Sequence, residues 1–358
     1  MLEQLTRQLA ASEPLTDAQV SLAVAQLVEE NVPALIKAEF LSQLARKGET
    51  AEEIGAFARE LRTRAIQPAI DGELRAREIL DVVGTGGDRL STFNISTATA
   101  LLAAAAGVLV AKHGNRASTS PIGSADVLEA LGIPHDLGPE EAVSSLKQHG
   151  FAFFFAPKYH PAFKHIIPAR KLCAARGQST IFNFLGPLLN PARPSAALIG
   201  VPRPSLCEPL GRVLQTLGVR RAMVVCGAVE AQISASQTPS PAFLDELSTL
   251  GDNTIAEFYQ DRGFSVSTMS PSHFSLQPAT LADLRGGDVD VNVGIIRGIL
   301  GGEERGPKRE AVLLNAAAAL FVAGRARNLT DGWEVAELVL DSGRARRKLE
   351  ELTGGKAG

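Results

Sequence analysis

Three glycines, at positions 84, 86 and 87, lie close together in the segment DVVGTGGD at residues 81–88. Glycine lets the backbone approach an oxyanion, consecutive N–H groups can surround that anion, and a following helix start adds partial positive charge. The segment therefore predicts a phosphate-binding loop, although its spacing fits neither the Walker nor the dinucleotide pattern. The alternative is a tight turn before a capped helix. The polar residues that follow are Thr92, Asn94, Ser96 and Thr97.

A second polar segment, KHGNR at residues 112–116, directly follows a predicted strand at residues 108–111. Ligands bind at the carboxyl ends of strands in parallel sheets. Lys112 and the hydroxyls of Ser120 and Ser124 could hold a pyrophosphate, and Asn115 could orient an amine or a carboxylate. The alternative is a polar loop that caps the next helix. A phosphate loop nearby favours the functional interpretation.

Two further features are charged side chains that could bind ions or charged substrates. Asp245 and Glu246 are adjacent acids before a helical stretch, and carboxylate oxygens are the ligands that magnesium prefers. Arg170 follows a run with helical periodicity, and its guanidinium could bind a carboxylate through two parallel hydrogen bonds. Taken alone, the acids could be solvated surface charge, and Arg170 could be a surface ion-pair partner.

The elements that must position these residues divide into two groups. Up to about residue 70 the pattern is helical, with capping boxes at Thr16 with Gln19 and Thr50 with Glu53. From residue 78, short β-branched or aromatic runs alternate with helical stretches, which is typical of a mainly parallel sheet. We expect an α/β protein with a small helical domain over residues 1–70, joined by part of 160–190, and a larger α/β domain over 75–358. The predicted strands are 79–83, 108–112, 152–156, 198–201 and 223–226, and residues 228–241 are expected to form an exposed loop.

Composition excludes several classes of function. The 358 residues carry a formal net charge of −3, which leaves no excess positive charge to neutralise a nucleic-acid backbone. The longest apolar run, residues 98–111, is too short to cross a bilayer about 30 Å thick. The first residues carry polar side chains too often for a secretory signal, and the three cysteines lack disulfide or zinc spacing. We therefore expect a cytoplasmic enzyme without a nucleic-acid or membrane partner.

Four motifs occur together in this chain: GTGGD at residues 84–88, NIST at 94–97, KHGNR at 112–116, and TIFNFLGPLLNPARP at 180–194. In this order and with these separations, the chain resembles the anthranilate phosphoribosyltransferases over nearly its whole length. The resemblance implies a Mg²⁺-dependent transfer of the phosphoribosyl group of phosphoribosyl pyrophosphate to the amine of anthranilate, in tryptophan biosynthesis. It also implies a homodimer formed through the helical domain, with substrates bound in a cleft between the domains.

The resemblance also implies roles for individual residues. Catalysis would depend on Lys112, Asp245 and Glu246, and magnesium would be held by Ser96, Asp245 and Glu246. Asn115 and Arg170 match anthranilate contacts. The residues that match phosphoribosyl pyrophosphate contacts are Gly84, Gly87, Asp88, Thr92, Asn94, Ser96, Thr97, Lys112, Ser120 and Ser124. No histidine nucleophile is implied, and His113 and His165 are expected to shape the pocket.

Two departures from the family pattern leave alternatives open. Residues 171–179, after the expected anthranilate contact at Arg170, and residues 227–244, before the acidic pair, are both longer than is usual. The same donor could therefore serve a different aromatic acceptor. A nucleoside phosphorylase on a similar scaffold would need no acidic metal pair, so Asp245 and Glu246 argue against it. A non-catalytic paralogue that binds nucleic acid would be expected to have eroded glycine loops and a basic surface, and neither is seen.

Overall fold

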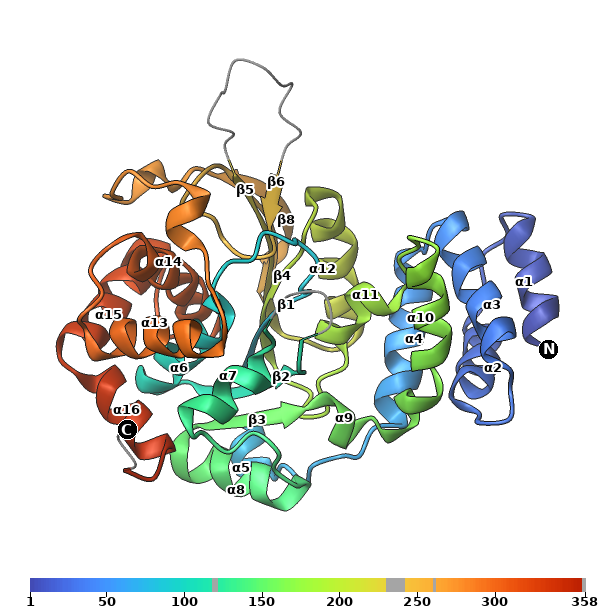
Figure 1. Cartoon of the computed structure of the whole chain (residues 1–358), viewed down its shortest axis with the longest axis horizontal. Helices are drawn as coiled ribbons and strands as arrows, with labels where there is room; N and C mark the ends of the chain where they lie inside the picture. Colours follow the sequence, from blue (N-terminus) through green and yellow to red (C-terminus); the bar gives the residue numbers. More distant parts are fainter. Residues whose placement is uncertain (118–121, 230–241, 260–261, 356–358) are drawn as a thin grey trace, which may run out of the picture.

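The chain folds into a small helical unit and a larger unit built around one sheet (Figure 1). The structure is a computed structural model, and it describes residues 1–117, 122–229, 242–259 and 262–355. These units are the two parts expected from the sequence, an all-helical start followed by an α/β part.

The helical unit begins with four helices, α1 (Leu2–Ala10), α2 (Asp17–Val28), α3 (Ala34–Lys47) and α4 (Ala51–Thr63). Both predicted capping boxes are present, at Thr16 before α2 and at Thr50 before α4. A fifth helix, α10 (Ile167–Ala175), comes from the middle of the chain and packs against α3. Its buried Ala169 and Cys173 join the apolar core of the first four helices. This packing supports the proposed division of the chain, with part of 160–190 joined to residues 1–70.

The larger unit contains an eight-stranded sheet in which β3, β2, β1, β4, β5, β7 and β8 follow in that order, with β6 also paired to β5. The first five strands in this order run parallel to one another. β6 and β7 each pair with β5 in the antiparallel direction, and β8 pairs antiparallel with β7. The strand bounds are β1 (Ile79–Gly84), β2 (Leu109–Gly114), β3 (Phe151–Phe155), β4 (Ala196–Gly200), β5 (Arg221–Val229), β6 (Ala242–Leu244), β7 (Asn253–Tyr259) and β8 (Arg262–Met269).

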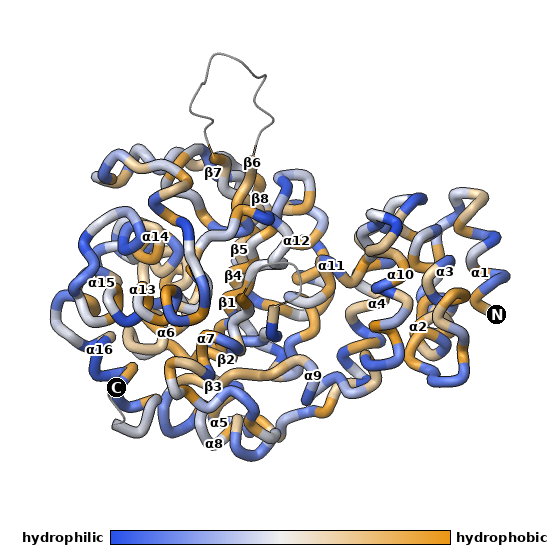
Figure 2. Tube along the Cα trace, in the orientation of Figure 1, coloured by the Kyte–Doolittle hydropathy of each residue, from blue (hydrophilic) through white to orange (hydrophobic). Residues whose placement is uncertain are grey.

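Helices cover both faces of this sheet because its strands are apolar on both sides. In β4, Leu198 faces the core built with α6 (Ile95–Ala105), while Ile199 faces α12 (Cys207–Thr216) and the helical unit. Figure 2 shows hydrophobic residues concentrated along the central strands. The remaining helices are α5 (Gly72–Arg75), α7 (Ser124–Leu131), α8 (Pro139–His149), α9 (Ala156–Tyr159), α11 (Phe182–Leu185), α13 (Val289–Gly301), α14 (Pro307–Val322), α15 (Leu329–Asp341) and α16 (Arg344–Leu352).

Two expectations about the α/β part need adjustment. The five predicted strands are all present, but the antiparallel extension by β7 and β8 was not predicted. The expected loop at 228–241 begins later, because β5 continues to Val229; residues 230–241 lie outside the described part of the chain. Within the described ranges, none of the helices has the length and apolar character needed to span a membrane.

Candidate active site

The carboxyl ends of β1 and β2 meet at the entrance of α6 and enclose a polar cavity of about 200 Å³. The glycine loop after β1, the KHGNR segment after β2 and the acidic pair after β6 all contribute walls. The sequence indicates these three segments independently, and the sheet topology brings them together. The predicted residues that line this cavity are Gly84, Asp88, Thr92, Asn94, Ser96, Lys112, Asn115, Ser124, Asp245 and Glu246.

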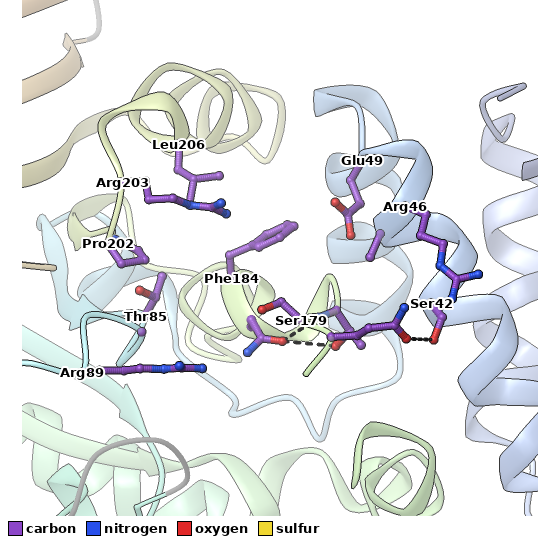
Figure 3. Close-up of a pocket in the computed structure, with 15 residues that line it drawn as sticks. Ser42, Arg46, Glu49, Thr85, Arg89, Ser179, Phe184, Pro202, Arg203 and Leu206 are labelled. Carbon is purple, nitrogen blue, oxygen red and sulfur yellow. Dashed lines mark hydrogen bonds between the residues drawn. The ribbon is translucent and has the colours of Figure 1, made fainter. Parts of the chain in front are cut away.

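Three predicted residues that the structure describes do not line this cavity, and a fourth predicted residue lies outside the described part of the chain. Thr97 is fully buried within α6, and its hydroxyl has no hydrogen-bond partner within the described structure. Gly87 faces a second cavity of about 470 Å³ between the two units (Figure 3). Arg170 lines neither cavity, and Ser120 lies outside the described residues. The expected roles of these four as contacts of the two substrates therefore stay proposals.

The glycine loop lies directly against the acidic pair. A side chain at Gly84 would place its Cβ 2.8 Å from Asp245 Oδ2, and one at Gly200 would meet the Asp245 carbonyl at 1.6 Å. Real Cβ atoms do not approach so closely, so glycine is required at both strand ends. The Asp245 carboxylate accepts hydrogen bonds from the Gly86 N–H and the Thr85 hydroxyl. The loop that was expected to hold phosphate therefore also holds Asp245.

Asp245 and Glu246 are both buried, and their surroundings disfavour the ionised form of each carboxyl group. Glu246 Oε1 accepts a hydrogen bond of 3.1 Å from the Ser96 N–H at the start of α6. Burial, with the nearby Asp88 carboxylate, raises the pKa of Asp245 to about 7. Burial and the adjacent Asp245 raise the pKa of Glu246 well above its ordinary value. A buried pair of carboxylates is the environment in which a bound cation would restore the ionised state of both.

Protein groups alone do not complete a metal site. Within the described part of the chain, no group of three or more histidine, cysteine, aspartate or glutamate side chains is arranged to hold a metal ion. Magnesium characteristically binds few carboxylates and takes its other ligands from substrate phosphates and water. Two carboxylates beside the predicted phosphate loop fit that pattern, with the Ser96 hydroxyl on the same wall.

Lys112 is a buried cation at the floor of the cavity. Its ammonium donates hydrogen bonds to the Val82 carbonyl at 2.6 Å and to the Ser96 hydroxyl at 3.3 Å. Burial lowers the pKa of Lys112, and the carboxylates of Asp81 and Glu246 oppose that change. The ammonium forms no direct ion pair with a described residue, which suits it to meet an anion entering the cavity.

Beneath the cavity lies a buried polar network that sequence reasoning did not assign to the site. Asp81 accepts hydrogen bonds from the His113 N–H at 3.1 Å and from the Asn190 side chain at 2.8 Å. Asn190 also donates to the Ala111 carbonyl at 2.7 Å, so it joins β1 to β2. Burial raises the pKa of Asp81 to about 6. Asn190 lies in the TIFNFLGPLLNPARP motif, but nothing in its sequence context indicates which residues it would meet.

Two neutral histidines lie beside this network. His113 Nδ1 is 3.1 Å from the Gly186 carbonyl, which can only accept, so Nδ1 carries the hydrogen and Nε2 has a free lone pair. That Nε2 is buried and has no partner within the described structure. Burial lowers the pKa of His113 to about 3 and that of His160 to about 4. As expected, His113 lines the cavity, whereas His165 does not line it. His160 was missed by sequence reasoning.

Arg170 is connected to the cavity by a row of rings. His113 lies 5.5 Å from His160, His160 stacks on Phe163 at 4.9 Å, and Phe163 contacts Phe182 at 5.7 Å. The Arg170 guanidinium lies 5.7 Å from the centre of the Phe182 ring. Burial lowers the pKa of Arg170. Among the described residues, it forms no hydrogen bond or ion pair that would neutralise its charge.

Arg170 lies within helix α10, and the segment that follows it, expected to be longer than is usual, leaves it there. Helix α10 continues to Ala175, and Gly177, at φ +68°, begins the turn that leaves the helix. The Gln178 side chain then reaches Ser42 on α3 at 2.7 Å. Residues 171–175 therefore continue α10, and Gln178 ties the following turn to the helical unit.

Comparison with known proteins gives a consistent result. A glycosyl transferase family model for an α/β domain matches residues 76–346, and the model for its helical bundle domain matches residues 3–65. The chain is 45% identical to the anthranilate phosphoribosyltransferase of Methanosphaerula palustris over 87% of its own length and 86% of the relative's. It is 43% identical to that of Geobacter sulfurreducens, over 94% of each chain.

Solved structures agree with these relatives. The anthranilate phosphoribosyltransferase of Thermus thermophilus superimposes with a TM-score of 0.84 at 37% identity, covering 98% of both chains. The enzyme of Saccharomyces cerevisiae in complex with phosphoribosyl pyrophosphate and magnesium gives 0.83 at 26% identity, covering 99% of this chain and 97% of that one. From its helical bundle through its α/β domain, this chain belongs to the anthranilate phosphoribosyltransferase family of glycosyl transferases.

Proposed function

We propose that this enzyme transfers the phosphoribosyl group of phosphoribosyl pyrophosphate to the amine of anthranilate and releases pyrophosphate, as a step of tryptophan biosynthesis. The observation that carries the proposal is the cavity in which the glycine loop, Lys112 and the buried acidic pair face one another. Relatives that cover almost the whole chain carry this activity in their names. The same findings favour neither a different acceptor nor a nucleic-acid-binding paralogue.

The donor would lie with its pyrophosphate over the glycine loop. Backbone N–H groups of the loop, the start of α6 and the Lys112 ammonium all present positive charge toward one space. Asn94 and Ser124 add side chains that can hydrogen-bond the ribose or the phosphates. Gly87 faces the second cavity and Thr97 is buried, so these two proposed donor contacts would need a local rearrangement.

Mg²⁺ fits the acidic pair. Asp245 and Glu246 are buried, their pKa values are raised, and neither forms an ion pair with a described residue. A phosphorylated substrate would bring the remaining ligands, and Ser96 lies close enough to contribute its hydroxyl. When bound, magnesium supplies positive charge that stabilises the departing pyrophosphate. The chain's own contribution is to hold two carboxylates beside the phosphate loop.

Anthranilate would bind on the side of the cavity that leads to Arg170. Its carboxylate would pair with the guanidinium, which lacks a counter-ion in the described structure. Asn115 and the free His113 Nε2 offer hydrogen-bonding groups within the cavity. The rings between His113 and Arg170 provide an apolar surface for the benzene ring.

The reaction itself needs little activation of the nucleophile. The amine nitrogen of anthranilate, already neutral at pH 7, forms a bond to the anomeric carbon of the ribose. The bond from that carbon to pyrophosphate breaks, its electron pair leaves with pyrophosphate, and the amine loses one proton. Catalysis therefore rests on holding the two substrates in line and on stabilising the leaving group, which is the task of Lys112 and the loop N–H groups.

The assembly and location of the enzyme are part of the proposal. Leu35 on α3 and Ile167 and Leu172 on α10 are exposed apolar side chains on two helices that pack together. Their exposure supports a homodimer formed through the helical unit. A biosynthetic enzyme of this composition, without a nucleic-acid or membrane partner, is expected in the cytoplasm.

One assay tests the activity and its main alternatives. The protein is incubated with phosphoribosyl pyrophosphate, magnesium and a panel of aromatic amines, while loss of anthranilate fluorescence and release of pyrophosphate are followed together. Turnover of anthranilate above the other amines supports the proposal. Turnover of another amine in its place would contradict the acceptor. In a parallel incubation with a nucleoside and inorganic phosphate, cleavage of the nucleoside would contradict the reaction.

A further inference from the structure

The second cavity, of about 470 Å³, lies beside the candidate active site, and among the proposed substrate contacts that the structure describes only Gly87 lines it. Its walls come from the end of α3, the loop after β1, the segment 178–184 and the turn before α12. It shares Thr85 with the candidate active site but is otherwise lined by different residues. Gln178 and Ser179, from the segment after Arg170, form part of one wall of the cavity.

Charges of both signs face this cavity. Glu49, just after α3, has one carboxylate oxygen, Oε1, that is buried without a hydrogen bond within the described structure. Burial raises the pKa of Glu49, and Arg203 across the cavity is among the groups that oppose the rise. Neither Glu49 nor Arg203 forms an ion pair with a described residue. A carboxylate torsion is broad, so either oxygen of Glu49 can turn toward a donor that enters.

An aromatic ring lies between these two charges, and the cavity wall also includes the polar side chains of Arg46, Arg89 and Asn183. Figure 3 shows the Glu49 carboxylate and the Arg203 guanidinium directed into the cavity from opposite sides, with the Phe184 ring between them. Leu206 and Pro202 continue this apolar wall. Ligand pockets commonly combine an apolar lining with a few polar groups that fix the orientation of the ligand.

We propose that this cavity binds a small zwitterion, an α-amino acid with an apolar or aromatic side chain. Its ammonium group pairs with Glu49, its carboxylate pairs with Arg203, and its side chain packs on Phe184 and Leu206. Such a ligand gives a counter-charge to the half-buried Glu49 carboxylate and to the exposed Arg203 guanidinium at once. It also contacts the helical unit and the sheet unit together.

Isothermal titration calorimetry of the full chain, without either substrate, tests this proposal. L-phenylalanine, L-tryptophan and L-leucine are titrated alongside phenethylamine, which lacks the carboxylate, and 3-phenylpropionate, which lacks the ammonium. At least one of the three amino acids is expected to bind at millimolar concentration or better. Both analogues are expected to bind about tenfold or more weakly, because each loses one charged contact.

Variants identify the site. Glu49→Gln and Arg203→Gln should each weaken amino-acid binding about tenfold or more. The matched controls Glu52→Gln and Arg7→Gln, exposed residues outside both cavities, should leave it unchanged. The proposal is overturned if none of the amino acids binds, if the analogues bind equally well, or if affinity survives both cavity variants. Loss of binding in Arg170→Ala alone would place the ligand at the candidate active site and overturn it as well. Since no substrate is present, these outcomes do not depend on the proposed reaction.

Discussion

Replacing Asp245 with asparagine should make the unliganded protein more stable and the enzyme inactive. Asparagine has nearly the same shape, and its carbonyl oxygen can still accept the hydrogen bond from the Gly86 N–H. What it removes is a buried negative charge next to Glu246 and Asp88. The structure therefore predicts that the Asp245 carboxylate lowers the free energy of unfolding of the free enzyme. Its charge is useful only when a cation and substrate are bound.

The magnitude follows from the raised pKa of Asp245. A rise from 3.8 to about 7 means that the folded protein holds a proton that the unfolded chain has already lost. The free energy of unfolding therefore falls as pH rises between about 4 and about 7, and the loss is complete above that range. At about 1.4 kcal/mol per pKa unit the upper limit is about 4 kcal/mol. Relaxation and water entry reduce it, and we expect Asp245→Asn to gain about 1–3 kcal/mol at pH 7.5.

Urea unfolding at pH 4.5 and pH 7.5 measures this difference, and a turnover assay measures the accompanying loss of activity. The gain should be small at pH 4.5 and larger at pH 7.5, while turnover falls by about a hundredfold or more. Asp252→Asn, a change at a nearby exposed acid, is the matched control and should alter neither quantity. A variant that is less stable than wild type at pH 7.5, or a gain that does not change with pH, would refute the reasoning.

Three further substitutions probe other parts of the site. Lys112→Ala should raise the KM for phosphoribosyl pyrophosphate more than that for anthranilate, and steady-state kinetics showing the reverse would remove Lys112 from the donor site. Arg170→Ala should lower kcat/KM for anthranilate by an amount equivalent to about 2–5 kcal/mol, and Arg170→Lys should restore it poorly. Equal reaction of anthranilate and aniline with the wild-type enzyme would contradict the carboxylate contact. Asn190→Ala leaves Asp81 with one hydrogen bond fewer and should lower the free energy of unfolding by about 1–3 kcal/mol, measured in urea; no loss would show that the Asp81 network does not stabilise the fold.

The parts of the site that lie at strand ends could be predicted from sequence. The glycine loop and Lys112 each follow a recognisable strand, and strand ends in a parallel sheet meet at one edge. These local signals indicated the segments that line the cavity with Gly84, Ser96 and Lys112. The helical start was predicted separately, from helical periodicity and its two capping boxes.

The remaining features depend on pairings between distant segments that no local pattern encodes. Asn190 meets Asp81 across 109 positions of the chain, and the row of rings from His113 to Phe182 combines residues from three separate segments. The antiparallel strands β7 and β8 were missed because they follow a segment with loop composition, and the pairing of β7 with β5 reaches across that segment. The second cavity depends on how two units approach each other, which a single sequence does not specify.

Helix α10 has a consequence for how the chain folds. The apolar face of α3 is completed by Cys173 and Ala169, residues that leave the ribosome long after α3 itself. The Cys173 thiol lies 3.5 Å from the Ala38 carbonyl, and the Ser42 hydroxyl likewise gains its contact with Gln178 only after α10 has been made. During synthesis the first four helices therefore expose part of their core until the chain has crossed into the sheet unit and returned. Residues 1–70 expressed alone should expose that face and associate, whereas a chain that extends past α10 should complete its helical unit before the sheet is finished.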